Sequence, residues 1–167
     1  MAKDYLNIIE RALMMGLSDK INTSVTEDIY VHGQFPQTED IKFPSIIVQQ
    51  VSSGFEEKFH GEKITFGSDS TTSSGEIYGM GFLVHILVDK ETEVTISGEV
   101  YKQRRLVNWL MLNIANTIME IDWSVYEEEE LQILERHLES WRDIGYIEAV
   151  QWYGATADFD IYFLNKR

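Results

Sequence analysis

The sequence predicts an α+β fold in which amphipathic helices pack on a mainly antiparallel β-sheet. Apolar residues occupy every even position from Tyr78 to Val88, which is the period of one face of a β-strand. Two other segments, 4–17 and 98–121, repeat apolar residues at the spacing of a helix. The chain also ends in a segment, 157–164, that alternates apolar and polar residues as half-buried antiparallel strands do.

Length and charge narrow the class of protein. The 167 residues suit one domain, and the absence of cysteine excludes disulfides and thiolate metal sites. A net charge of −14 repels phosphate backbones, so we expect no nucleic-acid binding site. The N-terminal segment carries acids and no apolar run reaches about 18 residues, so we expect neither a signal peptide nor a membrane partner.

The first third of the chain predicts one helix and two strands. The helix over 4–17 should bury a stripe of leucine and isoleucine. A short strand is expected at 28–32, followed by a connector over 33–44 that holds both prolines. Alternating residues then predict a strand over 45–52.

The next segment, 54–75, predicts an extended hairpin and a mobile loop that protrude from the domain. Phe55 and Phe59 lie on the expected arm, with a turn at 60–62. Residues 67–75, which include Ser70, hold no apolar side chain and so cannot contribute to a core.

The strand expected over 76–89 is the element around which we place the rest. Its odd positions are also apolar in their second half, as in a strand from the middle of a sheet. The helix that follows, from Ser97 or Gly98 to about Ile121, should pack on this strand with its apolar stripe.

Four large apolar residues of that helix fall outside its apolar stripe. Tyr101, Trp109, Leu112 and Met119 lie on the side that should face water. Several such residues on one helix face mark a contact surface, or else the C-terminal segment of the same chain covers them.

The C-terminal segment, 124–167, predicts a helix and a hairpin. Ser124 and Glu127 fit a capping box, and leucines at helical spacing carry the expected helix to about Gly145. The hairpin that follows should turn at 154–156.

No catalytic motif or metal-binding motif occurs in the sequence, and we expect no cofactor. The four histidines have no partner histidine at i+2, i+3 or i+4, so none forms a local metal motif. His85 is the best single candidate, and Asp158 and Asp160 share one strand face. An acidic hydrolase or ligand-binding domain that uses carboxylates with His85 is one hypothesis, and an inhibitor that mimics nucleic acid is another.

The order of elements resembles the tail terminator, or tail-completion, proteins of tailed bacteriophages. The resemblance covers roughly 1–121: an N-terminal amphipathic helix, a proline-led strand over 43–48, a loop, a long strand ending at Val88, and a helix. The segment after residue 124 is longer than expected for that family, which leaves a related neck or head–tail joining protein open.

This resemblance implies a structural protein of the virion with no active site. Such a protein forms a ring, usually a hexamer, that caps the tail tube and docks onto the connector or neck proteins of the head. It would be assembled in the host cytoplasm, and DNA would pass through the ring without specific binding. The candidate subunit interface is Tyr101, Trp109, Leu112 and Met119, together with Phe55, Phe59 and Ser70.

Overall fold

The computed structural model describes residues 5–23, 25, 28–33, 41–66, 71–125 and 131–166. For 5–6, 52–66, 71–76, 125, 131–132 and 165–166 it describes the backbone alone. Its elements are the helices α1 (Tyr5–Asn22) and α2 (Gln103–Glu120), the short 3-10 helix η2 (Trp123–Val125), and the strands β1 (Tyr30–His32), β2 (Ser45–Phe66), β3 (Thr71–Asp89), β4 (Glu93–Ile96), β5 (Glu99–Lys102), β6 (Leu131–Ile147) and β7 (Trp152–Lys166).

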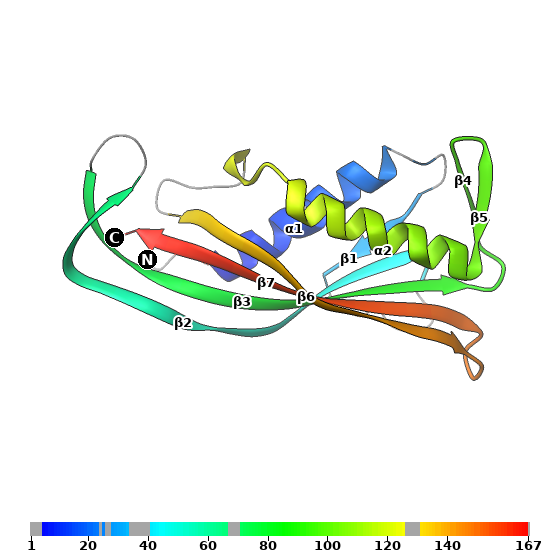
Figure 1. Ribbon diagram of the computed structural model, residues 1–167. Helices are drawn as coiled ribbons and strands as arrows, with labels where there is room; N and C mark the ends of the chain where they lie inside the picture. The colour runs from blue at the N-terminus through cyan, green and yellow to red at the C-terminus, as the bar shows by residue number, and fades with distance from the viewer. Residues whose placement is uncertain are drawn as a thin grey trace.

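The main sheet has the strand order β1-β2-β3-β7-β6, and β4 and β5 form a separate hairpin. β1 runs parallel to β2, and the other neighbouring strands are antiparallel. Figure 1 shows both α-helices on one side of this long, twisted sheet. The predicted α+β class is therefore confirmed. Neither described helix combines the length and hydrophobicity needed to cross a membrane.

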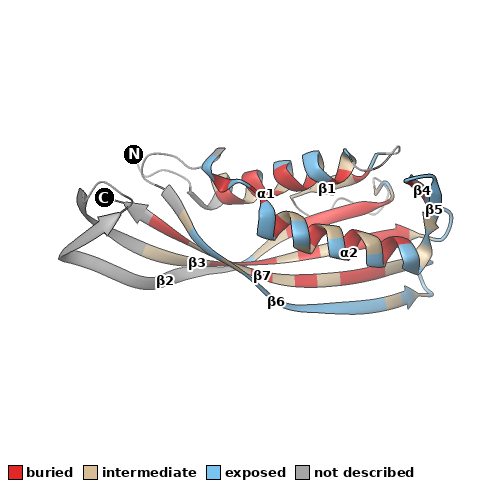
Figure 2. Ribbon diagram, turned by 45° about the horizontal axis from the view of Figure 1, so that its top comes forward, coloured by how far each residue is buried: buried red, intermediate tan, exposed pale blue. Residues whose placement is uncertain are grey.

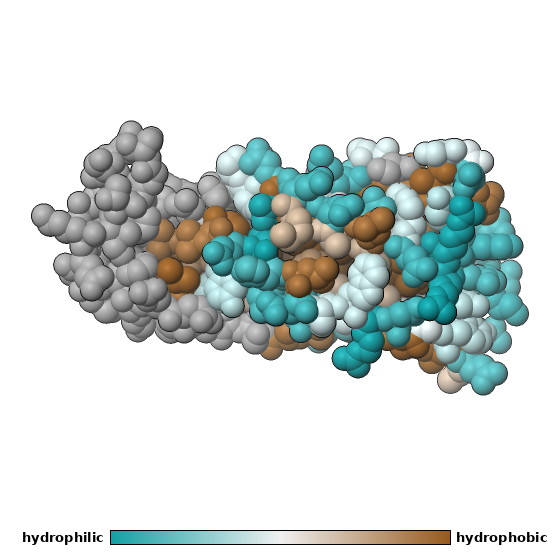
Figure 3. Space-filling model, in the orientation of Figure 1, coloured by the Kyte–Doolittle hydropathy of each residue, from teal (hydrophilic) through white to brown (hydrophobic). Residues whose placement is uncertain are grey.

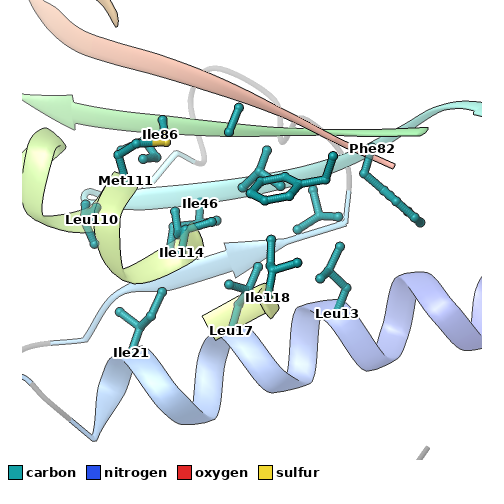
Figure 4. Packing of buried hydrophobic residues seen from close by; sticks show 14 of the residues in the cluster. Leu13, Leu17, Ile21, Ile46, Phe82, Ile86, Leu110, Met111, Ile114 and Ile118 are labelled. Carbon is teal, nitrogen blue, oxygen red and sulfur yellow. The ribbon is translucent and has the colours of Figure 1, made fainter. Parts of the chain in front are cut away.

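The hydrophobic core fills the space between the helices and one face of the sheet. It draws on Leu13, Leu17 and Ile21 of α1, Ile114 and Ile118 of α2, and Ile46, Phe82 and Ile86 of the sheet, which Figure 4 shows gathered in one layer. On α2 the buried residues recur every three or four positions, so one stripe of the helix faces the sheet.

β3 lies at the centre of the sheet, between β2 and β7, as the sequence predicts. Its even positions from Met80 to Val88 are buried against the helices. Their partners across the sheet include Val48, opposite Val84, and Phe159, opposite Phe82. Phe159, Ile161 and Phe163 are buried as well, so the alternation predicted for the last strand is confirmed.

The first helix is longer than expected. α1 continues to Asn22 instead of ending near Ser18. Gly16, which weakens a helix in isolation, lies directly against Ile121 at the end of α2, where a Cβ would sit 2.5 Å from Cδ1 of Ile121. Its cost to the helix is therefore offset by close packing between the two helices.

The second helix begins later than expected, at Gln103 instead of Ser97 or Gly98. The residues before it form the β4–β5 hairpin, whose two turn residues, Ser97 and Gly98, both have positive φ, 52° and 83°. That conformation matches the right-handed twist of a tight hairpin. Val100, expected on the buried helical stripe, is therefore an exposed strand residue.

The C-terminal helix predicted from Ser124 is wrong, because 131–147 forms the edge strand β6. Ser124 lies in η2 and bonds Asp122 instead of capping a helix, and Glu127 lies outside the described residues. β6 has register shifts at 133/135, 138/140 and 143/145, one every five residues. Each bulge inserts one extra residue into the alternation of the strand. The apolar residues of β6 are therefore spaced three or four positions apart, as they are in an amphipathic helix.

Two predicted turns are also wrong. β2 is one strand from Ser45 to Phe66, so it continues through 60–62. β7 likewise continues through 154–156, and the turn before it lies at 148–151, where Gln151 has a φ of 58°.

The structure changes one part of the predicted protruding hairpin and loop, and the rest stays a prediction. Residues 71–75, expected in the loop, belong to β3 and pair with β2. Residues 67–70 lie outside the described residues.

A single arginine of β6 links the edge strand to the end of α2. Nη1 of Arg136 donates hydrogen bonds to the carbonyl oxygens of Ile118 and Ile121, at 3.3 and 2.9 Å. The last carbonyls of a helix have no partner within the helix, and the negative end of its dipole favours a cation there. Arg136 thus caps α2 from a strand that follows it in the chain.

We predict that Arg136→Met lowers the free energy of unfolding by about 1–3 kcal/mol, the usual contribution of hydrogen bonds to a charged group. Urea denaturation followed by circular dichroism measures this. The matched control is Arg142→Met, because Arg142 is an exposed arginine of the same strand. Equal stability of the two variants would contradict the capping role.

Candidate interaction surface

The outward side of α2 carries exposed apolar side chains. Leu112 and Met119 are 54% and 45% exposed, and they lie two helical turns apart on one face. Ala115, which is partly buried, lies between them on the flank of that face. Figure 3 shows hydrophobic surface among hydrophilic groups in this region. We call Leu112, Ala115 and Met119 the α2 stripe. The exposed, uncharged Asn116 lies beside it.

Cations border the α2 stripe at the N-terminal end of the helix. Arg104 pairs with Asp143 at 2.8 Å, Arg105 pairs with Glu99 at 2.6 Å, and Lys102 lies 3.7 Å from Glu93. No acid occurs between Val100 and Met119, although the chain has 28. Cations at a helix N-terminus oppose the helix dipole, and here an acid of the same chain offsets each of them.

The four residues predicted from the helix pattern divide into two pairs. Tyr101 lies on β5 and Trp109 on α2, and their rings are 6.4 Å apart. Both are half-buried against the core, so they do not lie on the water-facing side as predicted. Arg105 stacks on the Tyr101 ring at 4.1 Å. Only Leu112 and Met119 of the four form an exposed apolar surface.

The side chains of the other predicted interface residues are not described by the structure. Phe55 pairs with Tyr78, and Phe59 pairs with Gly75, in the β2–β3 ladder. Only their backbone is described. Ser70 lies outside the described residues. Their role in an interface stays a prediction.

The face of the sheet opposite the helices carries a group of acids, of which the sequence predicted only that Asp158 and Asp160 share one strand face. We call this surface the open sheet face, where β6 and β7 place Glu135, His137, Ser140, Asp158 and Asp160 on the side away from α2. No described helix or strand of this chain covers it (Figure 2). The predicted helix over this segment would have separated these residues, so only the pairing of β6 with β7 brings them together.

The charges on the open sheet face influence one another. Burial and the nearby carboxylate of Glu139 raise the pKa of Asp160. A hydrogen bond from His137 to Glu135, at 2.9 Å, raises the pKa of His137. The raised pKa of Asp160 means that its negative charge is unfavourable in the folded chain, and a cation placed opposite it would relieve this cost.

His85 occupies the same face of the sheet, on β3. Its Nδ1 lies 3.0 Å from Oγ1 of Thr156, and its Nε2 lies 3.0 Å from Oε1 of Gln49. Burial lowers the pKa of His85, which favours the neutral ring. These contacts fit a histidine that ties β2, β3 and β7 together. The described residues hold no group of three or more histidine or acidic side chains arranged to bind a metal.

A small pocket of about 240 Å³ opens between α2 and β6. Trp141 of β6, which is 53% exposed, forms one wall, and Val107 and Met111 of α2 line another. The Arg104–Asp143 ion pair lies at its rim. The pocket therefore extends the apolar surface from the flank of α2 toward the edge strand.

No protein-family model matches this sequence, and no curated protein matches it. We therefore infer the function from the surfaces themselves and from the resemblance in element order.

We predict that His85 makes the fold sensitive to mild acid. Because its folded-state pKa lies below the unfolded value of about 6.5, the unfolded chain takes up the proton first and acid lowers the free energy of unfolding. Urea titrations from pH 7 down to about pH 5 should show a smaller loss of stability for His85→Gln than for the wild type.

The control is His137→Gln, because the pKa of His137 is raised and its loss should not reduce the acid sensitivity. The same pH dependence in the wild type and His85→Gln would show that His85 does not control this transition.

Proposed function

We propose that this chain is a structural subunit of a tailed-bacteriophage virion. In this proposal copies assemble into a ring, of six by the resemblance, which caps the tail tube and joins it to the connector or neck proteins of the head. The chain then acts by contact and not by catalysis. Its place would be the tail or neck of the virion, after assembly in the host cytoplasm.

The observation that carries this proposal is the α2 stripe. Leu112, Ala115 and Met119 follow the spacing of three and four residues by which a helix docks its apolar face on a partner. A single exposed leucine needs no explanation. Two large exposed side chains aligned on a helix whose opposite side forms the core point to a second layer of packing.

The charge distribution supports a ring around DNA. The net charge of −14 makes a surface that DNA can pass without sticking. The same charge makes copies repel one another, so at least one side of their contact must carry little negative charge. The outward side of α2 meets that condition, because 100–119 holds three cations and no acid, and each of those cations is paired with a nearby acid.

The first test is assembly of the wild type. Mass photometry of the purified protein, alone and with isolated tail tubes, should show a closed oligomer in solution or on the tube end. A protein that stays monomeric at all concentrations and also ignores tail tubes would refute the proposal.

We predict that Leu112→Glu abolishes assembly and leaves the fold intact. A buried, unpaired carboxylate costs several kcal/mol at an interface, whereas exposed Leu112 contributes little to the monomer. Mass photometry measures the oligomer, and thermal unfolding measures the monomer.

The matched control is Trp109→Glu on the same helix. Trp109 is half-buried against the core, so its loss should destabilise the monomer itself. Normal assembly of a folded Leu112→Glu variant would exclude the α2 stripe from the subunit contact.

A further inference from the structure

We infer that the subunits join head to tail, with the α2 stripe of one copy docked on the open sheet face of a second copy. This inference rests on the proposed function and names the surface that receives α2. The contact is then heterologous, because each copy binds one neighbour through its α2 stripe and another neighbour through its open sheet face.

The positions of the two surfaces in the fold support this geometry. α2 packs on one face of the main sheet, and the open sheet face is the other side of the same strands. A subunit with complementary surfaces on opposite sides propagates the contact from copy to copy. Such a chain of contacts closes into a ring when its rotation allows.

Charge complementarity selects a second copy as the occupant. Lys102, Arg104 and Arg105 border the α2 stripe, where each also pairs with one acid of its own chain. Glu135, Glu139, Asp158 and Asp160 lie on the two strands of the open sheet face, with His137 among them and one cation, Arg142, opposite Thr156. Docking would bring the cations of one copy to the acids of the next, and like surfaces would repel if they met each other.

The open sheet face also offers a suitable apolar floor. Leu83 of β3 lies opposite Asp158, and Tyr162 of β7 packs its ring edge-on against His137 at 5.9 Å. Both side chains are partly exposed. Apolar residues of the α2 stripe could cover them while the charged groups meet at the rim, as in ordinary protein interfaces.

The chain contains no cysteine, which permits a direct cross-linking test. A variant with Asn116→Cys, beside the α2 stripe, and Ser140→Cys, on the open sheet face, is treated with a short bis-maleimide under conditions in which the wild type assembles. Both replaced residues are exposed and uncharged. Denaturing electrophoresis should show a ladder of covalent oligomers. Each single-cysteine variant should stay a monomer on the gel, because a heterologous contact never brings two copies of one residue together.

The matched control replaces the second site with Met15→Cys, an exposed residue of α1 that belongs to neither surface. It should give no ladder. Covalent dimers from Asn116→Cys alone would show a symmetric α2–α2 contact and overturn the inference. An assembled double variant with no ladder beyond the control would overturn it too.

We also predict that Asp158→Lys with Asp160→Lys weakens assembly at least about tenfold, because the new cations face Arg104 and Arg105 of the next copy. Mass photometry over a dilution series measures this. Glu91→Lys with Glu148→Lys, two exposed acids outside both surfaces, makes the same change in net charge and should not weaken assembly.

Equal assembly of the two charge-reversal variants would overturn the inference. The two proposals can fail separately. Cross-linked rings that do not bind tail tubes would refute the phage function and support the contact between the α2 stripe and the open sheet face. Rings that cap tail tubes but give no cross-linked ladder would support the phage function and refute this contact.

Discussion

The fold depends on the burial of one row of side chains on β3 and β7. Phe82 and Phe159 lie opposite each other at its centre, and both are fully buried beneath the helices. Removing a buried phenylalanine side chain from a core costs about 3–5 kcal/mol, a large share of the stability of a domain this size. α2 packs over this row, and α1 packs on α2, β1 and β2, so the outward side of α2 takes its position from the row.

One consequence is that α2 has two apolar sides with different roles. Its inward stripe, which includes Leu110 and Ile114, completes the core. Leu112 and Met119 of the α2 stripe are left outside because no described element of this chain packs over them. Arg136 holds the C-terminal end of the helix, and cations gather at the other end. A helix fixed in this way presents the α2 stripe in one orientation, which favours a specific contact over a loose one.

The acidic composition constrains how such a protein can associate. Most of its surface repels another copy, so an attractive contact needs a region without net negative charge on one side and a region rich in acids on the other. The α2 side, where acids pair with cations, and the open sheet face differ in this way. The arrangement suits a contact that repeats in one direction, and in the proposed ring the remaining acids would face DNA or solvent.

The α+β class, the central strand and the inward apolar side of α2 can be predicted from the sequence, because their periodicity is kept in the structure. The sequence also singled out Leu112 and Met119. It failed at β6, where three bulges turn an alternating strand into an apparent helix. It also misplaced Tyr101, because the Ser97-Gly98 turn was read as the start of a helix.

Tertiary structure alone decided which residues meet on the open sheet face. Asp160 and His137 are far apart in the sequence, and they become neighbours only because β6 pairs with β7 at the edge of the sheet. Tertiary structure also placed this surface on the side opposite α2. Local sequence patterns record which side of a segment is apolar, but the pairing of strands decides which segments share a face.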